Sequence, residues 1–506
     1  MTVCFTAEQR SLLEVTDTLL VPVTDGGNPD ATVRELDEVL GGALGQQLTG
    51  IGLRGQVGRA AILPTWGRLP ARRLVITGIG APGRLTLDVI RRAWGAAAQV
   101  AAEAGVSVLV SPLPRVEGLD RGAICRAAVE GVGLGTYRFL DYRTGTAPAG
   151  QLDQVLFLAE PSVVAEAIER GRRTVDAVNL TRDLVNRPAN DLPPERLAGL
   201  ARELADQLGL ECTVYDQDLL AELGAGGILA VGRGSRHEPR LIHLVYRPAG
   251  ESRASVGLVG KGVTFDSGGL SIKPAEGMER MKGDMAGAAA VIGALQAVAT
   301  LGLPVTVHGV VAAAENMPDG AAFRPGDILR TLNGKTVEVI STDAEGRLLL
   351  ADALTYTARL GVEVVIDLAT LTGACVVALG KQAAGLFGTD SGLVDALVQA
   401  AERAGEKVWP MPLWDEYLEL LRSEHADLKN TGGRWGGAVN AALFLREFTQ
   451  GVRWAHLDIA GPAWAERASP LGPAGGTGYG VRTVVSFLEE SAGRSRNATM
   501  CPVPAG

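Results

Sequence analysis

The chain has 506 residues, of which 46% are hydrophobic and 21% are charged. This length and composition allow a large buried core and exclude intrinsic disorder as the main state. Because 57 Asp and Glu residues outnumber 48 Lys and Arg residues, the formal net charge is -9, which argues against a general polyanion-binding protein.

Cysteine usage indicates a reducing compartment. The five cysteines are scattered without a CxxC pair, which argues against a disulfide scaffold and excludes zinc-thiolate sites. The N-terminal segment lacks the basic and apolar regions of a secretory signal. We also expect no run of about 18 uncharged apolar residues long enough to span a membrane. These features predict a soluble, cytoplasmic protein without membrane association.

The order of predicted elements indicates an α/β fold with two domains. Residues 1–160 alternate short β-branched runs with alanine-rich segments, which predicts a smaller N-terminal α/β domain. A polar segment at 161–188 favours a connecting helix that ends near Pro188. Residues 189–491 alternate strand-like runs with helical stretches, which predicts a larger C-terminal domain with a mixed β-sheet sandwiched by helices. Residues 492–506 are expected to form a flexible tail.

Two glycine motifs resemble nucleotide-binding loops. Gly78 to Gly83 satisfies GxGxxG, which would suit a dinucleotide-dependent enzyme, but the next strand-like run at 106–114 supplies no acidic residue for a ribose. A structural turn is therefore the favoured interpretation. Asn333 to Thr336 ends like a P-loop, but Leu329 stands where the leading glycine is needed, so we expect a hairpin turn.

The five histidines carry no recognisable catalytic motif. The sequence has neither HExxH nor a GxSxG nucleophile elbow, so serine hydrolysis has no local support. His456 lies in an apolar run, and we interpret it as a hydrogen-bonded core histidine.

Two short segments concentrate ionisable residues where the hydrophobic pattern predicts the edge of a buried sheet. Lys261 and Asp266 follow the apolar run SVGLVG, so both are expected at the carboxyl end of a strand, where α/β sheets bind ligands. Asp343 and Glu345 are two residues apart after a strand-like run, and an extended segment would point both carboxylates to one side. Lys273, Asp284 and Arg347 complete the set.

The charges of this set suggest a two-metal centre. The carboxylates of Asp266, Asp284, Asp343 and Glu345 would repel one another in a low-dielectric site, and two divalent cations would balance them. Oxygen ligands suit manganese, magnesium or zinc, and a metal pair at roughly 3.5 Å lowers the pKa of a shared water. Lys273 and Arg347 would then stabilise negative charge on a reacting carbonyl oxygen. Lys261 must either lose its proton to ligate or serve as a counter-ion.

Other charged residues nearby are assigned no chemistry. Asp352, in a helical pattern, is interpreted as a structural carboxylate, and Glu279, Arg280 and Lys282 as solvated loop charges.

The motifs VGKGVTFDSGG, SIKP, MERMKGDMAGAA and STDAEGRL together resemble the leucyl aminopeptidase family of cytosolic two-metal exopeptidases. The resemblance continues through DLATLTGACVVALG, MPLWDEYLELL, HADLKNTGGR and WAHLDIAGPAW, and it covers about residues 170–490 strongly. The family signature NTDAEGRL is present with Ser341 in place of its asparagine, near the side of the leaving group.

The resemblance implies a role for each residue of the set. Ligands of the tighter-binding metal would be Lys261, Asp266, Asp284 and Glu345. Ligands of the looser metal would be Asp266, Asp343 and Glu345, with the main-chain carbonyl of Asp343. Lys273 and Arg347 match the two catalytic residues of the family, and Arg347 is expected to hold a bicarbonate ion that shuttles a proton. A pocket for the N-terminal side chain would be formed by Met281, Thr370, Gly373 and Ala463.

The expected activity is removal of an N-terminal Leu or other apolar residue from peptides by a hydroxide that bridges two Mn²⁺ or Zn²⁺ ions. The family usually assembles as a homohexamer, a dimer of trimers, and acts in peptide turnover. Some bacterial members also bind DNA, but the acidic net charge and the lack of a recognition-helix signature do not support that activity.

Overall fold

A computed structural model describes residues 3–25, 31–145 and 150–493. The chain forms two compact units, of which unit 1 comprises Met1–Asn179 and Glu466–Ala474 and unit 2 comprises Leu180–Ala465 and Gly475–Gly506. The division falls within helix α5 (Pro161–Asn186), in the segment that the sequence predicts to connect two domains. Residues 494–506, most of the predicted flexible tail, lie outside the described residues.

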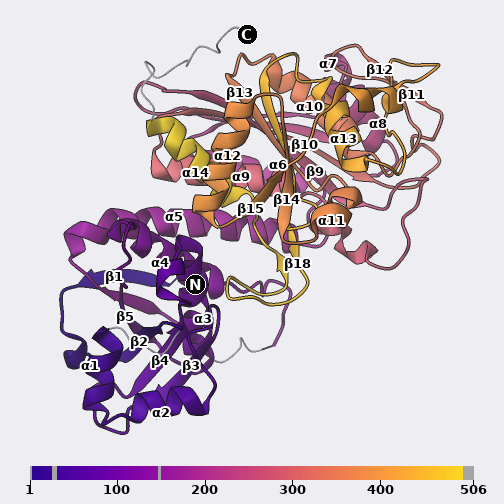
Figure 1. The fold of residues 1–506 in the computed structure, drawn as a ribbon. Helices are drawn as coiled ribbons and strands as arrows, with labels where there is room; N and C mark the ends of the chain where they lie inside the picture. Colours follow the sequence, from indigo (N-terminus) through magenta and orange to yellow (C-terminus); the bar gives the residue numbers. More distant parts are fainter. Residues whose placement is uncertain (1–2, 26–30, 146–149, 494–506) are drawn as a thin grey trace. The chain divides into compact units, whose positions relative to one another are not determined.

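Unit 1 contains a six-stranded sheet with helices on both faces (Figure 1). Its strands are parallel except the edge strand β3. In sheet order they are β1 (Cys4–Glu8), β6 (Gln154–Leu158), β5 (Val108–Pro112), β2 (Thr18–Val23), β4 (Arg73–Gly78) and β3 (Ala60–Pro64). The helices are α1 (Ala31–Val39), α2 (Ala43–Gly50), α3 (Leu87–Glu103) and α4 (Arg121–Gly135), with 3-10 turns η1 (Leu12–Glu14) and η2 (Pro82–Arg84).

The central strands of unit 1 bury side chains on both faces. Along β4, Leu74 and Ile76 pack in one apolar cluster with α1 and α2, while Val75 packs in the other cluster with α3 and α4. This alternation is required because successive side chains of a strand point to opposite faces. It explains why these strands read as continuous apolar runs, and it confirms the predicted N-terminal α/β domain.

Unit 2 contains an eight-stranded mixed sheet, as predicted. Antiparallel pairs join β14 to β17, β10 to β8 and β8 to β7, and the remaining neighbours are parallel. In sheet order the strands are β15 (Lys407–Pro410), β14 (Ala383–Gly388), β17 (Arg453–Asp458), β13 (Val364–Ala369), β9 (Ser255–Asp266), β10 (Thr306–Asn316), β8 (Arg240–Tyr246) and β7 (Glu211–Tyr215).

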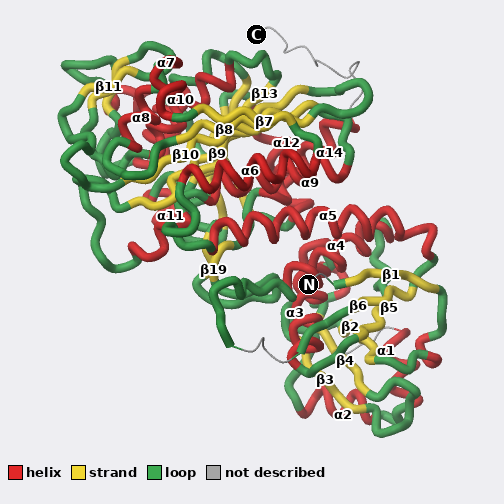
Figure 2. The backbone as a smooth tube through the Cα atoms, turned by 180° about the vertical axis from the view of Figure 1, so that it is seen from behind, coloured by secondary structure: helices red, strands yellow, loops and turns green. Residues whose placement is uncertain are grey.

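Helices cover both faces of this sheet (Figure 2). One face carries α6 (Pro194–Leu208), α9 (Ala286–Leu301), α12 (Ser391–Ala404) and α14 (Val481–Gly493), and the other carries α8 (Gly226–Gly232), α10 (Gly346–Ala358) and α13 (Gly437–Arg446). Two glycines of β9 allow close helix approach, because a Cβ at Gly260 would lie 2.6 Å from Ala288 of α9 and one at Gly257 would lie 2.5 Å from Thr357 of α10. The remaining elements are α7 (Gln217–Leu223), α11 (Gly373–Leu379), η3 (Met278–Gly283), η4 (Asp415–Leu421), and the short strands β11 (Ile328–Arg330), β12 (Thr336–Glu338), β16 (Leu428–Lys429), β18 (Trp464–Ala465) and β19 (Gly475–Gly476).

Both glycine motifs form turns. Gly78 ends β4, and a Cβ there would lie 2.2 Å from the Gln56 carbonyl oxygen, so glycine is required by close backbone packing. The turn at Asn333 to Thr336 joins the antiparallel strands β11 and β12, with Gly334 at φ +90°. The structure confirms the predicted hairpin.

One expectation about apolar runs is wrong. The helical stretch Met278–Leu301 is long and apolar enough to span a membrane by length and composition. Within unit 2, however, 78% of its most apolar window is buried, and its helix α9 packs against the central strands. Such a stretch is also what the core helix of a large α/β sheet requires.

A cluster of two histidines and two tyrosines links β7, β8, β10 and α10. His243 Nε2 and His308 Nδ1 are 3.0 Å apart, and Tyr356 Oη lies 3.0 Å from His243 Nδ1 and 3.1 Å from Tyr215 Oη. Burial, with the neighbouring His308, lowers the pKa of His243 to about 4, and burial also lowers the pKa of His308. The charge of Glu211 raises the pKa of both histidines, and the charge of Arg247 lowers it.

This cluster predicts a loss of stability in mild acid. Because the folded-state pKa of His243 lies below its unfolded value of 6.5, the unfolded chain binds more protons as the pH falls from 6.5 toward 4. We expect His243→Gln to reduce the drop in melting temperature between pH 7 and pH 5, measured by calorimetry under identical metal conditions. The control His425→Gln changes an exposed histidine outside the cluster and should leave the drop unchanged. Equal drops in both variants would contradict the assignment.

Candidate active site

A cavity of about 640 Å³ in unit 2 brings the predicted site residues together. Its lining includes all eleven of them, namely Lys261, Asp266, Lys273, Met281, Asp284, Asp343, Glu345, Arg347, Thr370, Gly373 and Ala463. They come from four stretches of sequence spread over about 200 residues, from Lys261 to Ala463, so only the tertiary fold places them in one cavity.

The cavity opens at the carboxyl edge of the sheet, where strand β13 ends several residues before its neighbour β9. Strand β13 pairs with β9 only from Val256 to Gly260, so β9 is uncovered on that side from Lys261 onward. On its other side β9 continues beside β10 up to the pair Asp266 and Asn316. Lys261 therefore lies in the middle of a strand, five residues before its end, and not at the strand end as the sequence suggested. Its ammonium still reaches the carboxyl edge of the sheet, because β13 ends beside it.

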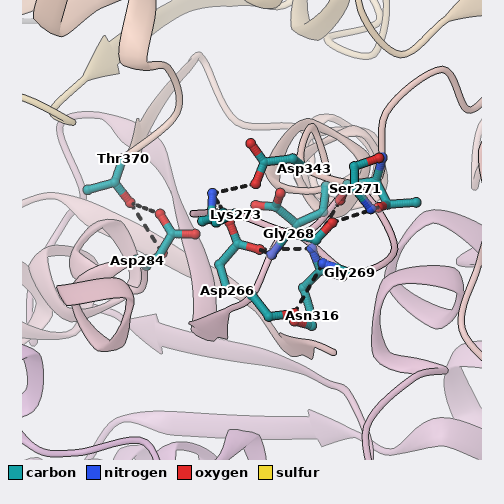
Figure 3. A network of polar contacts seen from close by, with 12 residues as sticks. Asp266, Gly268, Gly269, Ser271, Lys273, Asp284, Asn316, Asp343 and Thr370 are labelled. Atoms are coloured by element: carbon teal, nitrogen blue, oxygen red, sulfur yellow. Dashed lines mark hydrogen bonds and ion pairs between the residues drawn. The ribbon is translucent and has the colours of Figure 1, made fainter. Parts of the chain in front are cut away.

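A glycine turn fixes Asp266 (Figure 3). Its Oδ1 accepts hydrogen bonds from the Gly268 backbone NH at 2.9 Å and from Asn316 Nδ2 at 2.8 Å. Gly268 has φ +86°, and a Cβ there would lie 2.5 Å from the Ser271 carbonyl oxygen and 2.9 Å from Asp343 Oδ1. Glycine is needed both for this backbone conformation and for the approach of the second carboxylate.

Asp343 and Glu345 converge for a different reason from the one expected. The segment is a turn and not extended, and Glu345 is the N-cap of α10 with helical angles of φ -76° and ψ -37°. Even so, carboxylate oxygens of Asp266, Asp343 and Glu345 all lie within 4.8 Å of one another. The predicted clustering is therefore correct, although a helix start and a turn create it.

Asn430 holds this turn in place. Its buried amide donates to the carbonyl oxygens of Ser341, at 2.7 Å, and Ala344, at 3.3 Å, and it accepts from the backbone NH of Ile340 at 2.8 Å. The Asn430 carbonyl oxygen also accepts from Arg347 Nη1 at 2.8 Å. In the sequence this asparagine appears only as part of the motif HADLKNTGGR. Its role could not be predicted there, because its hydrogen-bond partners are about 85 residues away along the chain.

Lys261 links Asp284 to Glu345. Its Nζ lies 2.8 Å from Asp284 Oδ2 and 3.1 Å from Glu345 Oε1, and it donates to the Thr370 carbonyl oxygen at 2.9 Å. Thr370 Oγ1 in turn donates to Asp284 Oδ1 at 2.7 Å (Figure 3). A Cβ at Gly346 would lie 2.8 Å from Lys261 Nζ, so a glycine after Glu345 leaves room for the ammonium.

Lys273 lies between the other two carboxylates. Its Nζ is 2.7 Å from Asp266 Oδ2 and 2.5 Å from Asp343 Oδ1 (Figure 3). Burial alone would lower the pKa of Lys273, but the nearby carboxylates, led by Asp266, outweigh burial and raise it. The side chain is therefore a cation that faces the cavity.

The pKa values of three of the carboxylates are raised, which disfavours their ionised forms. Burial raises the pKa of Glu345 and that of Asp284, and the negative charge of Asp266 raises both further. Burial also raises the pKa of Asp343. Each shift is in the direction expected when like charges are crowded in a low-dielectric site, so added positive charge would stabilise the ionised forms.

Arg347 is buried on the first turn of α10. Burial lowers the pKa of its guanidinium to about 10, although Glu345 and Asp458 oppose the shift. Its Nε makes no hydrogen bond to the part of the chain that the structure describes. A buried cation with an unused donor is suited to bind an anion.

The residues fit the pair of divalent cations that the sequence suggests. Four carboxylates outnumber the two ammonium groups among them, and Glu345 Oε2 is buried without a hydrogen-bond partner among the described residues. Hard oxygen donors of this kind suit manganese, magnesium or zinc.

Two interpretations from the sequence need correction. Lys282 is not a solvated loop charge, since its Nζ donates to the Asn186 carbonyl oxygen at 2.8 Å and lies 5.8 Å from the centre of the Trp464 ring. His456 is buried as predicted and its Nδ1 is bonded to Asp367 at 2.6 Å, but its Nε2 has no partner among the described residues. Asp352 is structural as expected, because it accepts from the backbone NH groups of Ile228 and Leu332.

Comparison with protein families agrees with this geometry. Residues 179–485 match the catalytic domain of the cytosol aminopeptidase family, and residues 20–146 match the N-terminal domain of that family. The probable cytosol aminopeptidase of Geobacter sulfurreducens is 47% identical over 464 residues, which cover 91% of this chain and 93% of that protein. The corresponding protein of Geotalea uraniireducens is 48% identical over 460 residues, which cover 90% and 92%.

Solved structures show the same fold. A mutant of tomato leucine aminopeptidase is 35% identical, covers 96% of each chain and superposes with a TM-score of 0.88. The bottromycin maturation enzyme BotP in complex with Mn is 40% identical, covers 94% of this chain and all of its own, and superposes with a TM-score of 0.84. The chain therefore belongs to the cytosol aminopeptidase family and is a metal-dependent exopeptidase that hydrolyses peptides from the amino end.

Proposed function

We propose that this aminopeptidase removes leucine or another apolar residue from the amino end of peptides by means of two divalent ions bound in the cavity. The observation that carries the proposal is a group of four carboxylates, three of them buried and that of Asp343 exposed, interleaved with Lys261 and Lys273 at one side of a cavity of about 640 Å³. Enzymes of the family use two divalent metals, and the BotP structure contains Mn.

The ligands we propose are those that the resemblance to the family implies. Lys261, Asp266, Asp284 and Glu345 would hold the tighter ion, and Asp266, Asp343 and Glu345, with the Asp343 main-chain carbonyl, the looser one. Support comes from the three carboxylates with oxygens within 4.8 Å of one another. Lys261 can ligate only as a neutral amine, and its carboxylate neighbours oppose loss of its proton until a second positive charge is present. Manganese or zinc held there would polarise the scissile carbonyl and lower the pKa of a water.

Two cationic side chains would act on the substrate. The Lys273 ammonium is placed to stabilise negative charge that develops on the carbonyl oxygen, and its raised pKa keeps it charged. Arg347 would hold bicarbonate, an anion that can accept and return a proton, through its guanidinium, whose Nε has no partner among the described residues.

The first side chain of the substrate would occupy the space between Met281, Thr370, Gly373 and Ala463. Small and apolar residues there leave room for a Leu-like or Met-like group. Ser341, which replaces the asparagine of the family signature, lines the same cavity, and its Oγ accepts from the Asp343 backbone NH at 3.2 Å. We therefore assign Ser341 to the support of Asp343 and do not transfer the family's preference for the second residue.

The cellular setting is proposed from the family alone. We propose a cytoplasmic enzyme of peptide turnover that assembles as a homohexamer, a dimer of trimers. Sedimentation of the purified protein would test the assembly, since a monomer at micromolar concentration would contradict it.

Metal-dependent hydrolysis of leucine p-nitroanilide tests the proposal. Protein stripped of metal should be inactive, and manganese or zinc should restore release of the chromophore. An Asp343→Ala/Glu345→Ala variant should stay inactive with metal present, because two of the proposed ligands are missing. Tight metal binding without cleavage of any aminoacyl substrate would leave the metal centre intact and refute the assigned side-chain pocket.

A further inference from the structure

A second hollow lies beside the active-site cavity in unit 2. This side groove has a volume of about 480 Å³ and is bounded by Val377 of α11, Met411, and Trp435 and Val439 around the start of α13. Ala374, Arg434 and Gly437 line both hollows, so the side groove and the active-site cavity are adjacent.

Helix α11 is the wall between the two hollows. Gly373 and Val376, three residues apart, line the active-site cavity. Ala374, Val377 and Ala378 recur at helical spacing and line the side groove. Residues three and four apart share a helix face, so neighbouring faces of one short helix serve the two hollows.

Only small residues separate the two hollows where α11 packs against α13. A Cβ at Gly437 would lie 3.0 Å from the Cβ of Ala374, which is tight contact. Glycine at 437 and a methyl group at 374 are therefore the only groups at this contact between α11 and α13.

The side groove is chemically suited to an apolar group. Val377 is 89% exposed and Trp435 is 78% exposed, the two highest values among the large apolar side chains in the described part of the chain. The Arg434 guanidinium lies 5.2 Å from the centre of the Trp435 ring, and none of the described residues that line the groove is acidic. An apolar side chain on a chain that ends in a carboxylate would match both properties.

We propose that the side groove binds an apolar side chain of the peptide substrate downstream of the cleaved bond. The inference rests on the proposed function: when the enzyme cleaves after the first residue, all other residues of the peptide lie on the leaving-group side of the cleaved bond. An extended peptide advances about 3.3 Å per residue, so a side chain one to three residues beyond the cleaved bond is within reach of an adjacent hollow. The side groove thereby determines a preference for a residue downstream of the cleaved bond, which the pocket for the first residue cannot determine.

A position scan with one phenylalanine tests this inference. The metal-loaded protein is assayed with Leu-Gly-Gly-Gly and with the three tetrapeptides in which one glycine is replaced by Phe. We expect one Phe position to raise kcat/KM about tenfold, the usual effect of filling an apolar subsite. A Val377→Ser/Trp435→Ala variant should lose most of that gain and should hydrolyse Leu-Gly-Gly-Gly, which has no side chain downstream of the cleaved bond, at the native rate.

Matched controls separate the alternatives. Trp409→Ala removes another exposed tryptophan, at 63% exposure, that lines neither hollow, and it should keep the native preference. The inference is overturned if no Phe position is favoured, or if the double variant changes selectivity for the first residue instead. It is also overturned if that variant loses activity on all substrates equally and sediments as a smaller species, because the groove would then be an interface between copies of the chain. Failure of the native protein to cleave any substrate would instead refute the proposed function.

Discussion

Replacement of Asp284 by alanine is expected to remove divalent metal from the purified protein and to lower hydrolysis of leucine p-nitroanilide on the order of a thousandfold. The side chain is 8% exposed, and its Oδ1 accepts from Lys261 Nζ at 2.9 Å and from Thr370 Oγ1 at 2.7 Å. Both donors orient the carboxylate toward the cluster. Its loss would leave Lys261 with Glu345 as its remaining anionic contact and would remove a proposed ligand.

Elemental analysis after dialysis measures this effect without any assay of turnover. The native protein should retain close to two metal ions per chain under conditions in which Asp284→Ala retains fewer. Asp352→Asn is the matched control, because Asp352 is also a buried aspartate of unit 2 but bonds only backbone NH groups outside the cavity. Full metal content in Asp284→Ala would show that Asp284 is not a ligand, whatever its effect on rate.

The sequence predicted which residues meet in the cavity better than it predicted how they meet. Asp266 was expected at the end of a strand, and it ends β9. Lys261 was expected at the same end but lies five residues earlier, because the edge of the sheet at that point is set by the length of β13. The length of a neighbouring strand is a property of the paired sheet and cannot be inferred from the run SVGLVGKG alone.

Asp343 and Glu345 show the same limit. Their spacing suggested an extended segment, and the structure has a turn that ends in the N-cap of α10. The turn is fixed by Asn430 and by Thr342, whose Oγ1 donates to the Gly268 carbonyl oxygen at 2.6 Å. Contacts between residues 70 to 90 positions apart create this geometry, so local propensity could not reveal it.

Supporting residues were the least predictable. Lys282 looked like one of several loop charges, yet it bonds to the Asn186 carbonyl oxygen, 96 positions earlier in the chain. Asp458 appeared only within the apolar motif WAHLDIAG, and its Oδ2 accepts from Thr372 Oγ1 at 2.7 Å beside the pocket. Without the fold, a buried polar residue that satisfies a distant loop is indistinguishable from an ordinary strand residue.

Replacement of Lys273 by alanine is expected to lower kcat by about 100-fold to 1000-fold while the protein keeps both metal ions. The Lys273 ammonium contacts Asp266 and Asp343, which hold it at the side of the cavity where the proposed ions and the scissile carbonyl would meet. An interaction that strengthens only as negative charge develops affects kcat more than KM. Metal content should persist, because Lys273 is not among the proposed ligands and its removal takes away a competing cation.

Rates and metal content must therefore be measured on the same samples. Lys335→Ala is the control, because Lys335 pairs with Glu447 at the β11–β12 turn, outside the cavity, and should leave both quantities unchanged. Lys273→Arg tests geometry against charge: arginine retains the positive charge but presents a planar fork in place of a compact ammonium, so only partial recovery is expected. An unchanged rate in Lys273→Ala would refute the catalytic assignment. A loss of rate that metal addition repairs would instead assign Lys273 to positioning Asp266 and Asp343, because only the arrangement of the ligands would then depend on it.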